Sequence, residues 1–253
     1  MHFYVIKLRW LIAMAAVIVC IIIGVFVDIT VPTLSVNGRE IPIYSVERTD
    51  NKIALTFDCA WNDDDLIEIL DTLDEYDAKA TFFIVGDWAL MYPDSVWEIH
   101  RRGHEIGTHS MSHDDYTKMS PDEILNDIYA CEEIILDITN NRPRLLRAPS
   151  GAYNDTVIKT CEENGRIYIQ WSVDGIDYEE DATEESIYNR VIDKTGAGDI
   201  ILLHNGTEHT ADVLPQILET LGENYEFVKV SSLIYLDGFM IDSAGRQHKY
   251  SSD

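Results

Sequence analysis

Positive charge is scarce in this chain of 253 residues: 19 Lys and Arg stand against 45 Asp and Glu, and the formal net charge is −26. Binding to nucleic acid depends on Lys and Arg that neutralise phosphates, so this shortage argues against a nucleic-acid partner. The same charge would repel anionic polymers, which makes a neutral glycan or a metal ion an easier partner. A surface charged only for solubility is the simpler interpretation.

Cysteine and glycine-rich turns are also sparse. The chain has four cysteines, and Cys20 lies in an apolar run, which leaves Cys59, Cys131 and Cys161. An odd number of thiols cannot all pair, so a framework built on disulfides is not indicated. No Gly-x-Gly-x-x-Gly turn is present, which removes the usual signal for a dinucleotide-binding sheet.

Only one hydrophobic run approaches the length of a bilayer, and it lies at the N-terminus. Residues 11–27 carry no charge, Lys7 and Arg9 precede them, and Asp28 follows. A cleaved signal peptide would have a shorter apolar core and a small-x-small cleavage site, which this segment lacks. We therefore predict one transmembrane helix within residues 1–30, single-pass in the plasma membrane, with the rest of the chain on the outer face.

The remaining chain is long enough for one large domain. Residues 31–51 are interrupted by Pro32, Gly38 and Pro42 and are predicted to be a stalk or lead-in. Residues 52–236 are predicted to form the domain itself, as a monomer. The polar, glycine-containing residues 237–253 are predicted to be a loose tail.

Within the domain, short apolar segments alternate with segments of helical periodicity. Strands are predicted at residues 53–58, 80–86, 105–110, 145–147, 167–173, 199–204 and 227–231. Helices are predicted at residues 63–76, 88–102, 120–139, 155–163, 184–195 and 211–221. This alternation indicates an α/β fold whose parallel strands are joined by right-handed crossovers. We expect a distorted (β/α) barrel of about seven strands, with an open doubly wound sheet as the alternative.

Residues that can ionise or bind metal gather where the predicted strands end. They are Asp58, His109, His113, Arg147, Asp174, Asp177 and His204. In a (β/α) barrel this edge carries the active site. Because several independent strands each contribute such a residue, chance is a poor explanation of the pattern.

The residue types suggest metal-assisted hydrolysis. His109 and His113 are four residues apart and would share one face of a helical turn, where they could bind one metal ion. Asp58 could accept a proton from a water that the ion activates. His204 could protonate a leaving amine, because its pKa lies near neutrality. Taken singly, each histidine is as well explained as an ordinary surface or core residue.

These segments together resemble the five motifs of the polysaccharide deacetylase family, also called the NodB-homology or carbohydrate esterase family 4 domain. The resemblance covers roughly residues 52–234. In order, the segments are Thr56-Phe57-Asp58, His109-Ser-Met-Ser-His113, Arg147-Ala-Pro149-Ser150-Gly151, Asp174-Gly-Ile-Asp177-Tyr178 and Leu202-Leu-His204.

The resemblance implies a divalent metal ion, with zinc favoured, and hydrolysis of an N-acetyl or sometimes an O-acetyl group on a glycan. Peptidoglycan is the leading substrate, because the catalytic domain is expected outside the membrane. The implied roles are Asp58 as base, His204 as acid, Arg147 and Asp177 as their partners, and His109 and His113 as metal ligands. Ser150, whose backbone N–H would stabilise the oxyanion, Gly151 and Trp171 would contact the substrate. The alternative is a non-catalytic glycan-binding wall protein derived from this fold.

Two positions depart from the family pattern. Cys59 stands where the family has its third metal ligand, an aspartate, and Ser150 replaces an aromatic residue that walls the sugar groove. A thiolate binds zinc well, so Cys59 could itself be the third ligand. Alternatively, Asp64 or Asp65 could reach back to the ion. In a third version two histidines and water hold the metal, or the metal is lost.

Overall fold

The computed structural model describes residues 40–250. The chain divides between residues 30 and 31, and the first part lies outside the described residues. The predicted transmembrane segment, residues 11–27, is in that part. No helix in the described range has the length and apolar character needed to cross a bilayer. The described residues therefore give no support to the predicted single-pass membrane location.

A parallel sheet forms the centre of the domain. Within residues 40–250 its seven main strands follow the order β6-β5-β4-β3-β2-β8-β7. Their bounds are β2 (Lys52–Cys59), β3 (Ala80–Ile84), β4 (Glu105–Thr108), β5 (Leu145–Leu146), β6 (Ile167–Tyr168), β7 (Val173–Asp174) and β8 (Ile200–His204). A short further strand, β9 (Glu226–Phe227), pairs with the start of β2. The parallel direction throughout confirms the predicted α/β topology.

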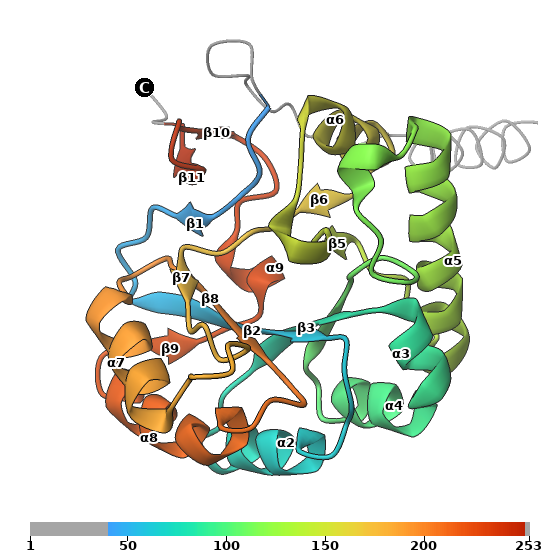
Figure 1. The fold of residues 1–253 in the computed structure, drawn as a ribbon. Coiled ribbons are helices and arrows are strands. Elements are labelled where there is room, and N and C mark those ends of the chain that lie inside the picture. Colours follow the sequence, from blue (N-terminus) through green and yellow to red (C-terminus); the bar gives the residue numbers. More distant parts are fainter. Residues whose placement is uncertain (1–39, 251–253) are drawn as a thin grey trace, which may run out of the picture. The chain divides into compact units, whose positions relative to one another are not determined.

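Helices cover the outside of this sheet (Figure 1). Their bounds are α2 (Leu66–Glu75), α3 (Gly86–Met91), α4 (Pro93–Arg101), α5 (Pro121–Thr139), α6 (Asp155–Glu163), α7 (Glu184–Lys194) and α8 (Thr210–Gly222). The short α9 (Val230–Leu233) instead packs with Ala54 and Phe83 on the other face of the sheet. Two 3₁₀ turns are η1 (Tyr116–Lys118) and η2 (Pro149–Gly151). The start of α5 shows why prediction succeeded there: Ser120 and Glu123 cap each other's backbone and Pro121 takes the first position.

Alternation along β2 separates two environments. Ile53, Leu55, Phe57 and Cys59 belong to the apolar cluster that also contains the buried faces of α2, α3 and α8. Successive side chains of a strand point to opposite faces, so Thr56 and Asp58 face away from the helices. The strand thus carries apolar packing on one side and the polar interior on the other.

The two edge strands, β6 and β7, are not paired with each other in the described part of the chain. Residues 43–46 run from the end of β6 to the start of β8, since Ile43 bridges Ile169 and Ser45 bridges Asp199. Backbone bonds strengthen this closure: the Val46 N–H donates to the Gly198 carbonyl at 2.8 Å. The arrangement fits the predicted distorted (β/α) barrel, left incomplete at one place.

A second, small sheet joins the two segments that were predicted to be a stalk and a tail. β1 (Ser45–Val46) pairs in parallel with β11 (Arg246–Lys249), which pairs antiparallel with β10 (Phe239–Ile241). Phe239 and Ile241 are buried beside Ile43. The segment from residue 239 to 249 is therefore packed against the domain rather than loose.

Three predicted elements are divided or replaced. The helix expected at 88–102 is two helices, because Tyr92 leaves helical geometry before Pro93 begins α4. The strand expected at 167–173 is split into β6 and β7, which lie at opposite edges of the sheet. The strand expected at 227–231 becomes the short β9 followed by α9. An apolar run alone does not show at which residue a buried strand stops pairing with its neighbour in the sheet.

Candidate active site

Asp58 and His204 lie beside each other at the ends of neighbouring strands. They are register partners in the parallel pair of β2 and β8. Both strands end at the edge of the barrel where the following loops begin, so the two side chains open toward the same space. The sequence predicted both residues as catalytic, and the fold brings them together from positions 146 residues apart in the chain.

A buried arginine holds the Asp58 carboxylate. Arg147, just after β5, donates from Nη1 to Asp58 Oδ1 at 2.7 Å and from Nη2 to the Gln170 carbonyl at 3.2 Å. Its guanidinium also packs over the ring of Phe83, 4.2 Å from the centroid. Burial alone would raise the pKa of Asp58, but Arg147 and the nearby imidazoles outweigh it and lower that pKa. The carboxylate is therefore ionised and can accept a proton.

His109 and His113 form a pair beside Asp58. His109 Nδ1 donates to the Arg147 carbonyl at 2.8 Å, because a carbonyl oxygen can only accept. This bond leaves Nε2 facing Asp58 Oδ2 at 3.5 Å. The ring of His113 meets that of His109 edge to face, with centroids 5.1 Å apart. Burial lowers the pKa of His109 to about 4, so its imidazole is neutral, as a metal ligand must be.

A second carboxylate holds His204. Asp177 Oδ1 accepts a hydrogen bond from His204 Nδ1 at 2.8 Å, and its Oδ2 accepts the His204 backbone N–H at 2.7 Å. The hydroxyl of Thr210 also donates to Oδ2, at 2.5 Å. Burial would lower the pKa of His204, but the bond and charge of Asp177 raise it above its ordinary value. His204 is thereby suited to give up a proton from Nε2.

These groups surround one cavity of about 240 Å³. Its lining residues are Asp58, Ala60, Trp61, His109, His113, Ser150, Trp171, Tyr178, Leu202 and His204. Arg147 and Asp177 are buried behind the lining, at 0% and 4% exposure. Gly151 lies next to Trp171: a Cβ at this glycine would come within 2.7 Å of the indole ring. The cavity therefore unites residues from all five segments singled out in the sequence.

Comparison with known proteins agrees with this arrangement. Residues 45–169 match the model of the polysaccharide deacetylase family. A peptidoglycan-N-acetylglucosamine deacetylase of Bacillus cereus is 35% identical over 197 residues, which cover 76% of this chain and 92% of that protein. The chain belongs to the polysaccharide deacetylase family. The resemblance inferred from the five motifs is confirmed.

Other family members extend the comparison in two directions. The peptidoglycan-N-acetylmuramic acid deacetylase PdaC of Bacillus subtilis is 34% identical over 190 residues, and the match spans 75% of this chain but only 40% of PdaC. BA3943 from Bacillus anthracis, described as a pseudoenzyme of carbohydrate esterase family 4, has a solved structure. It matches with a TM-score of 0.73 and 28% identity, over 85% of this chain and 73% of BA3943. The fold therefore occurs in both active and inactive members.

The structure does not bring Cys59 to the cavity. This side chain is fully buried in the apolar cluster between β2 and the helices, on the face of β2 opposite Asp58. Burial, together with the charges of Asp58 and Asp65, raises the pKa of its thiol well above the ordinary value. A thiol on the face of β2 that packs against the helices is directed away from an ion bound by His109 and His113.

Asp64 and Asp65, the other proposed ligands, are also absent from the lining of the cavity. Asp64 is exposed in the turn before α2. Asp65 Oδ1 accepts the backbone N–H of Gly206 at 2.8 Å, which ties the start of α2 to the loop after β8. Burial raises the pKa of Asp65 to about 6. Of the sequence alternatives, the third remains: two histidines and water hold the metal, or the metal is lost.

Four lining residues were missed as site residues: Ala60, Trp61, Tyr178 and Leu202. Trp61 and Tyr178 place their rings 5.1 and 5.2 Å from the His204 ring, and both are more than one third exposed. Leu202 precedes His204 by two positions in β8 and so shares its face. Closeness in the sequence to predicted catalytic residues could have revealed two of them, since Tyr178 follows Asp177 directly and Trp61 lies three residues after Asp58.

The donors in the cavity fit a divalent ion. The imidazoles of His109 and His113 and the carboxylate of Asp58 line the cavity, and zinc accepts donors of these types; His109 Nε2 lies 3.5 Å from Asp58 Oδ2. The bond from His109 Nδ1 to a backbone carbonyl is the kind of support that metal-binding histidines have. His109 and His113 could therefore hold an ion next to Asp58.

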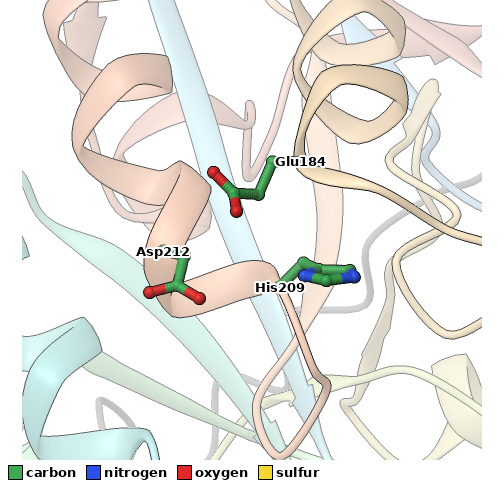
Figure 2. A group of neighbouring side chains, drawn as sticks. All are labelled: Glu184, His209 and Asp212. Atoms are coloured by element: carbon green, nitrogen blue, oxygen red, sulfur yellow. The ribbon is translucent and has the colours of Figure 1, made fainter.

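A different group of possible ligands lies outside this cavity (Figure 2). Single ligand atoms of Glu184, His209 and Asp212 lie within 4.8 Å of one another. Glu184 and Asp212 are exposed and occupy the first turns of α7 and α8, where the helix dipole stabilises negative charge. That position accounts for both acids, and none of the three residues lines the cavity at Asp58.

Proposed function

We propose that the chain is a metal-dependent hydrolase that removes N-acetyl groups from a cell-wall polysaccharide, namely peptidoglycan. One observation carries the proposal. Asp58 and His204 are neighbours across one cavity, and a buried residue of opposite charge holds each of them. Their pKa values are shifted in opposite directions, which is the arrangement expected of a base and an acid that act in turn.

Asp58 is the general base in this scheme. Its Oδ1 is held by Arg147, while Oδ2 faces the cavity next to His109. An ionised carboxylate in this position accepts the proton of a water molecule that attacks the acetyl carbonyl carbon. Arg147 keeps the carboxylate in one orientation, and its charge keeps the base ionised.

His109 and His113 would hold the metal ion, with water in the remaining positions. A bound divalent ion would supply Lewis acidity toward the acetyl oxygen and would lower the pKa of the attacking water. The residues of the chain prepare for this role, because the Arg147 carbonyl fixes the tautomer of His109 that leaves Nε2 free. The backbone N–H of Ser150, at the cavity wall, would donate to the oxyanion.

His204 is the general acid. With Nδ1 bound to Asp177, its other nitrogen can deliver a proton to the amine as the carbon–nitrogen bond breaks. The amide therefore ends as acetate and a free amino sugar. Asp177 raises the pKa of His204, so the imidazole keeps its proton to a higher pH than an ordinary histidine does.

A sugar substrate suits the exposed aromatic side chains at the mouth of the cavity. Trp61 is 48% and Tyr178 43% exposed, and both lie beside His204. Large aromatic faces provide apolar contact area with a polar edge, which the faces of sugar rings can use. Peptidoglycan is the substrate named for the relatives in Bacillus cereus and Bacillus subtilis, and we extend it to this chain.

The competing proposal is a glycan-binding protein without activity. Two observations favour it: Cys59 points away from the histidines, and one similar protein of solved structure, BA3943, is a pseudoenzyme. Against it stand the two buried ion pairs at Asp58 and His204, which a binding surface does not need.

Acetate release and metal content separate the two proposals. We expect the purified protein to hold about one zinc ion per chain and to release acetate from peptidoglycan. Asp58→Asn should reduce release by about 10²–10⁴-fold and keep the metal, since it removes the base but not the imidazoles. Asp64→Asn, a change at an exposed acid outside the cavity, is the matched control and should keep full activity. A wild-type protein that neither holds metal nor releases acetate would establish the binding protein instead.

A further inference from the structure

The turn between the two proposed metal ligands has an unfavourable backbone conformation. Ser110 and His113 have positive φ angles of 69° and 62°. Residues with a side chain rarely adopt this left-handed region, so neighbouring groups must hold the turn in place. Any release of the turn would move His113 relative to His109, because the two are separated by only three residues.

One set of contacts comes from the start of α3. The backbone N–H of Gly86 donates to the Ser110 carbonyl at 2.9 Å, and that of Asp87 donates to the Met111 carbonyl at 2.8 Å. The approach is tight, since a Cβ at Gly86 would lie 3.1 Å from the Met111 carbonyl oxygen and 3.2 Å from its Cα. These bonds occupy the Ser110 and Met111 carbonyls, but the Met111 N–H needs an acceptor from another part of the chain.

That partner is Asp127 in the middle of α5. Its Oδ1 accepts the Met111 N–H at 2.9 Å and the Tyr116 hydroxyl at 2.5 Å. Tyr116 is fully buried among apolar residues, which fixes its hydroxyl and, through it, the carboxylate. Asp127 does not line the cavity, so it can act there only through the turn.

We propose that Asp127 is a positioning residue that sets the geometry of the His109–His113 pair for one metal ion. The inference rests on the proposed function. Because Cys59 points away from the cavity, only two imidazoles would bind the ion, in place of the three protein ligands of the family pattern. A site with fewer protein ligands depends more strongly on how well those ligands are held in place.

The test is zinc affinity, measured by competition with a chromophoric chelator on the complete purified chain. Asp127→Ala should weaken zinc binding by about 10–100-fold, the usual effect of removing a group that orients metal ligands. Asp127→Asn should lose less than about tenfold, because its amide oxygen can still accept the Met111 N–H. Asp137→Ala is the matched control, as Asp137 is an exposed acid on the same helix, and should bind zinc like the wild type.

Two further measurements distinguish positioning from a general loss of stability. The d–d absorption of Co²⁺-substituted protein reports the ligand geometry, so it should change in Asp127→Ala and stay the same in Asp137→Ala. In metal-free protein, the Met111 amide should exchange faster in Asp127→Ala, while amides in the core strands keep their protection. Such a change without loss of the core strands assigns the effect to the turn.

The outcomes are separable. If the wild type binds zinc and Asp127→Ala binds it within about threefold with an unchanged Co²⁺ spectrum, the positioning role is overturned while the proposed function stands. If Asp127→Ala unfolds, Asp127→Leu decides in its place, because leucine fills a similar space but offers no acceptor to the Met111 N–H. Zinc affinity and a Co²⁺ spectrum equal to those of the wild type in that variant refute the inference. Failure of the wild type to bind zinc refutes the proposed metal site, and the positioning role with it.

Discussion

Replacing Asp177 by asparagine would test the coupling between the proposed acid and its partner most directly. Asp177 is buried, and its two oxygens accept three hydrogen bonds, from His204 Nδ1, the His204 backbone N–H and the Thr210 hydroxyl. Two of these donors meet at Oδ2. In Asp177→Asn the amide oxygen is best placed at that position, which turns the NH₂ group toward His204 Nδ1.

The direction and size of the effect follow from this geometry. The NH₂ group is a donor, so Nδ1 can no longer carry a proton without two donors facing each other. A hydrogen bond to a charged group contributes about 1.5–3 kcal/mol, which corresponds to about 1–2 pH units. Since the bond to Asp177 raises the pKa of His204, its loss lowers that pKa. His204 acts as an acid only when protonated, and so the alkaline limb of the activity profile should move down by about 1–2 pH units.

Two measurements check this result. The pH dependence of kcat/KM for acetate release gives the alkaline limb, and NMR of the His204 ring protons gives its pKa without catalysis. Glu180→Gln is the control, because Glu180 is an exposed acid in the neighbouring loop and its loss should leave the limb in place. An unchanged pKa of His204 in Asp177→Asn, with the fold intact, would refute the reasoning.

Two remaining predictions concern the packing of the barrel. Cys59→Ala should keep its bound zinc and lose about 1–2 kcal/mol of stability, because the thiol packs in the core. Cys161→Ala, which removes another buried thiol, is the control. Loss of zinc in the Cys59 variant alone would show that Cys59 is a ligand. Gly198→Ala should lose at least about 2 kcal/mol in denaturant unfolding, since its φ is +86° and a Cβ would lie 1.7 Å from the Val46 carbonyl oxygen. Gly196→Ala, with ordinary contacts in the same turn, should be nearly neutral, and equal stability of the two variants would contradict the tight closure between β1 and β8.

The elements that sequence patterns located well are those with local signals. The helix predicted at 120–139 begins at a capping box and agrees with α5, and the predicted helix at 155–163 agrees with α6. The strand at 167–173 failed because the chain leaves one edge of the sheet after Tyr168 and rejoins at the other edge at Val173. No local pattern records which edge a buried segment will join. The packed hairpin of β10 and β11 was missed for the same reason, since its partner β1 lies about 200 residues away.

The sequence by itself determined the chemical groups of the site and their order along the chain. Asp58, His109, His113, Arg147 and His204 could be named because each follows a recognisable strand, and parallel strands end at one edge of a barrel. Only the tertiary structure decided which way the Cys59 side chain points. A strand alternates its faces, and packing against α2 and α8 placed Cys59 toward the helices when Asp58 turned to the cavity. The contacts of Asp127 likewise depend on how α5 packs beside the turn at Met111, and no spacing in the sequence records that contact.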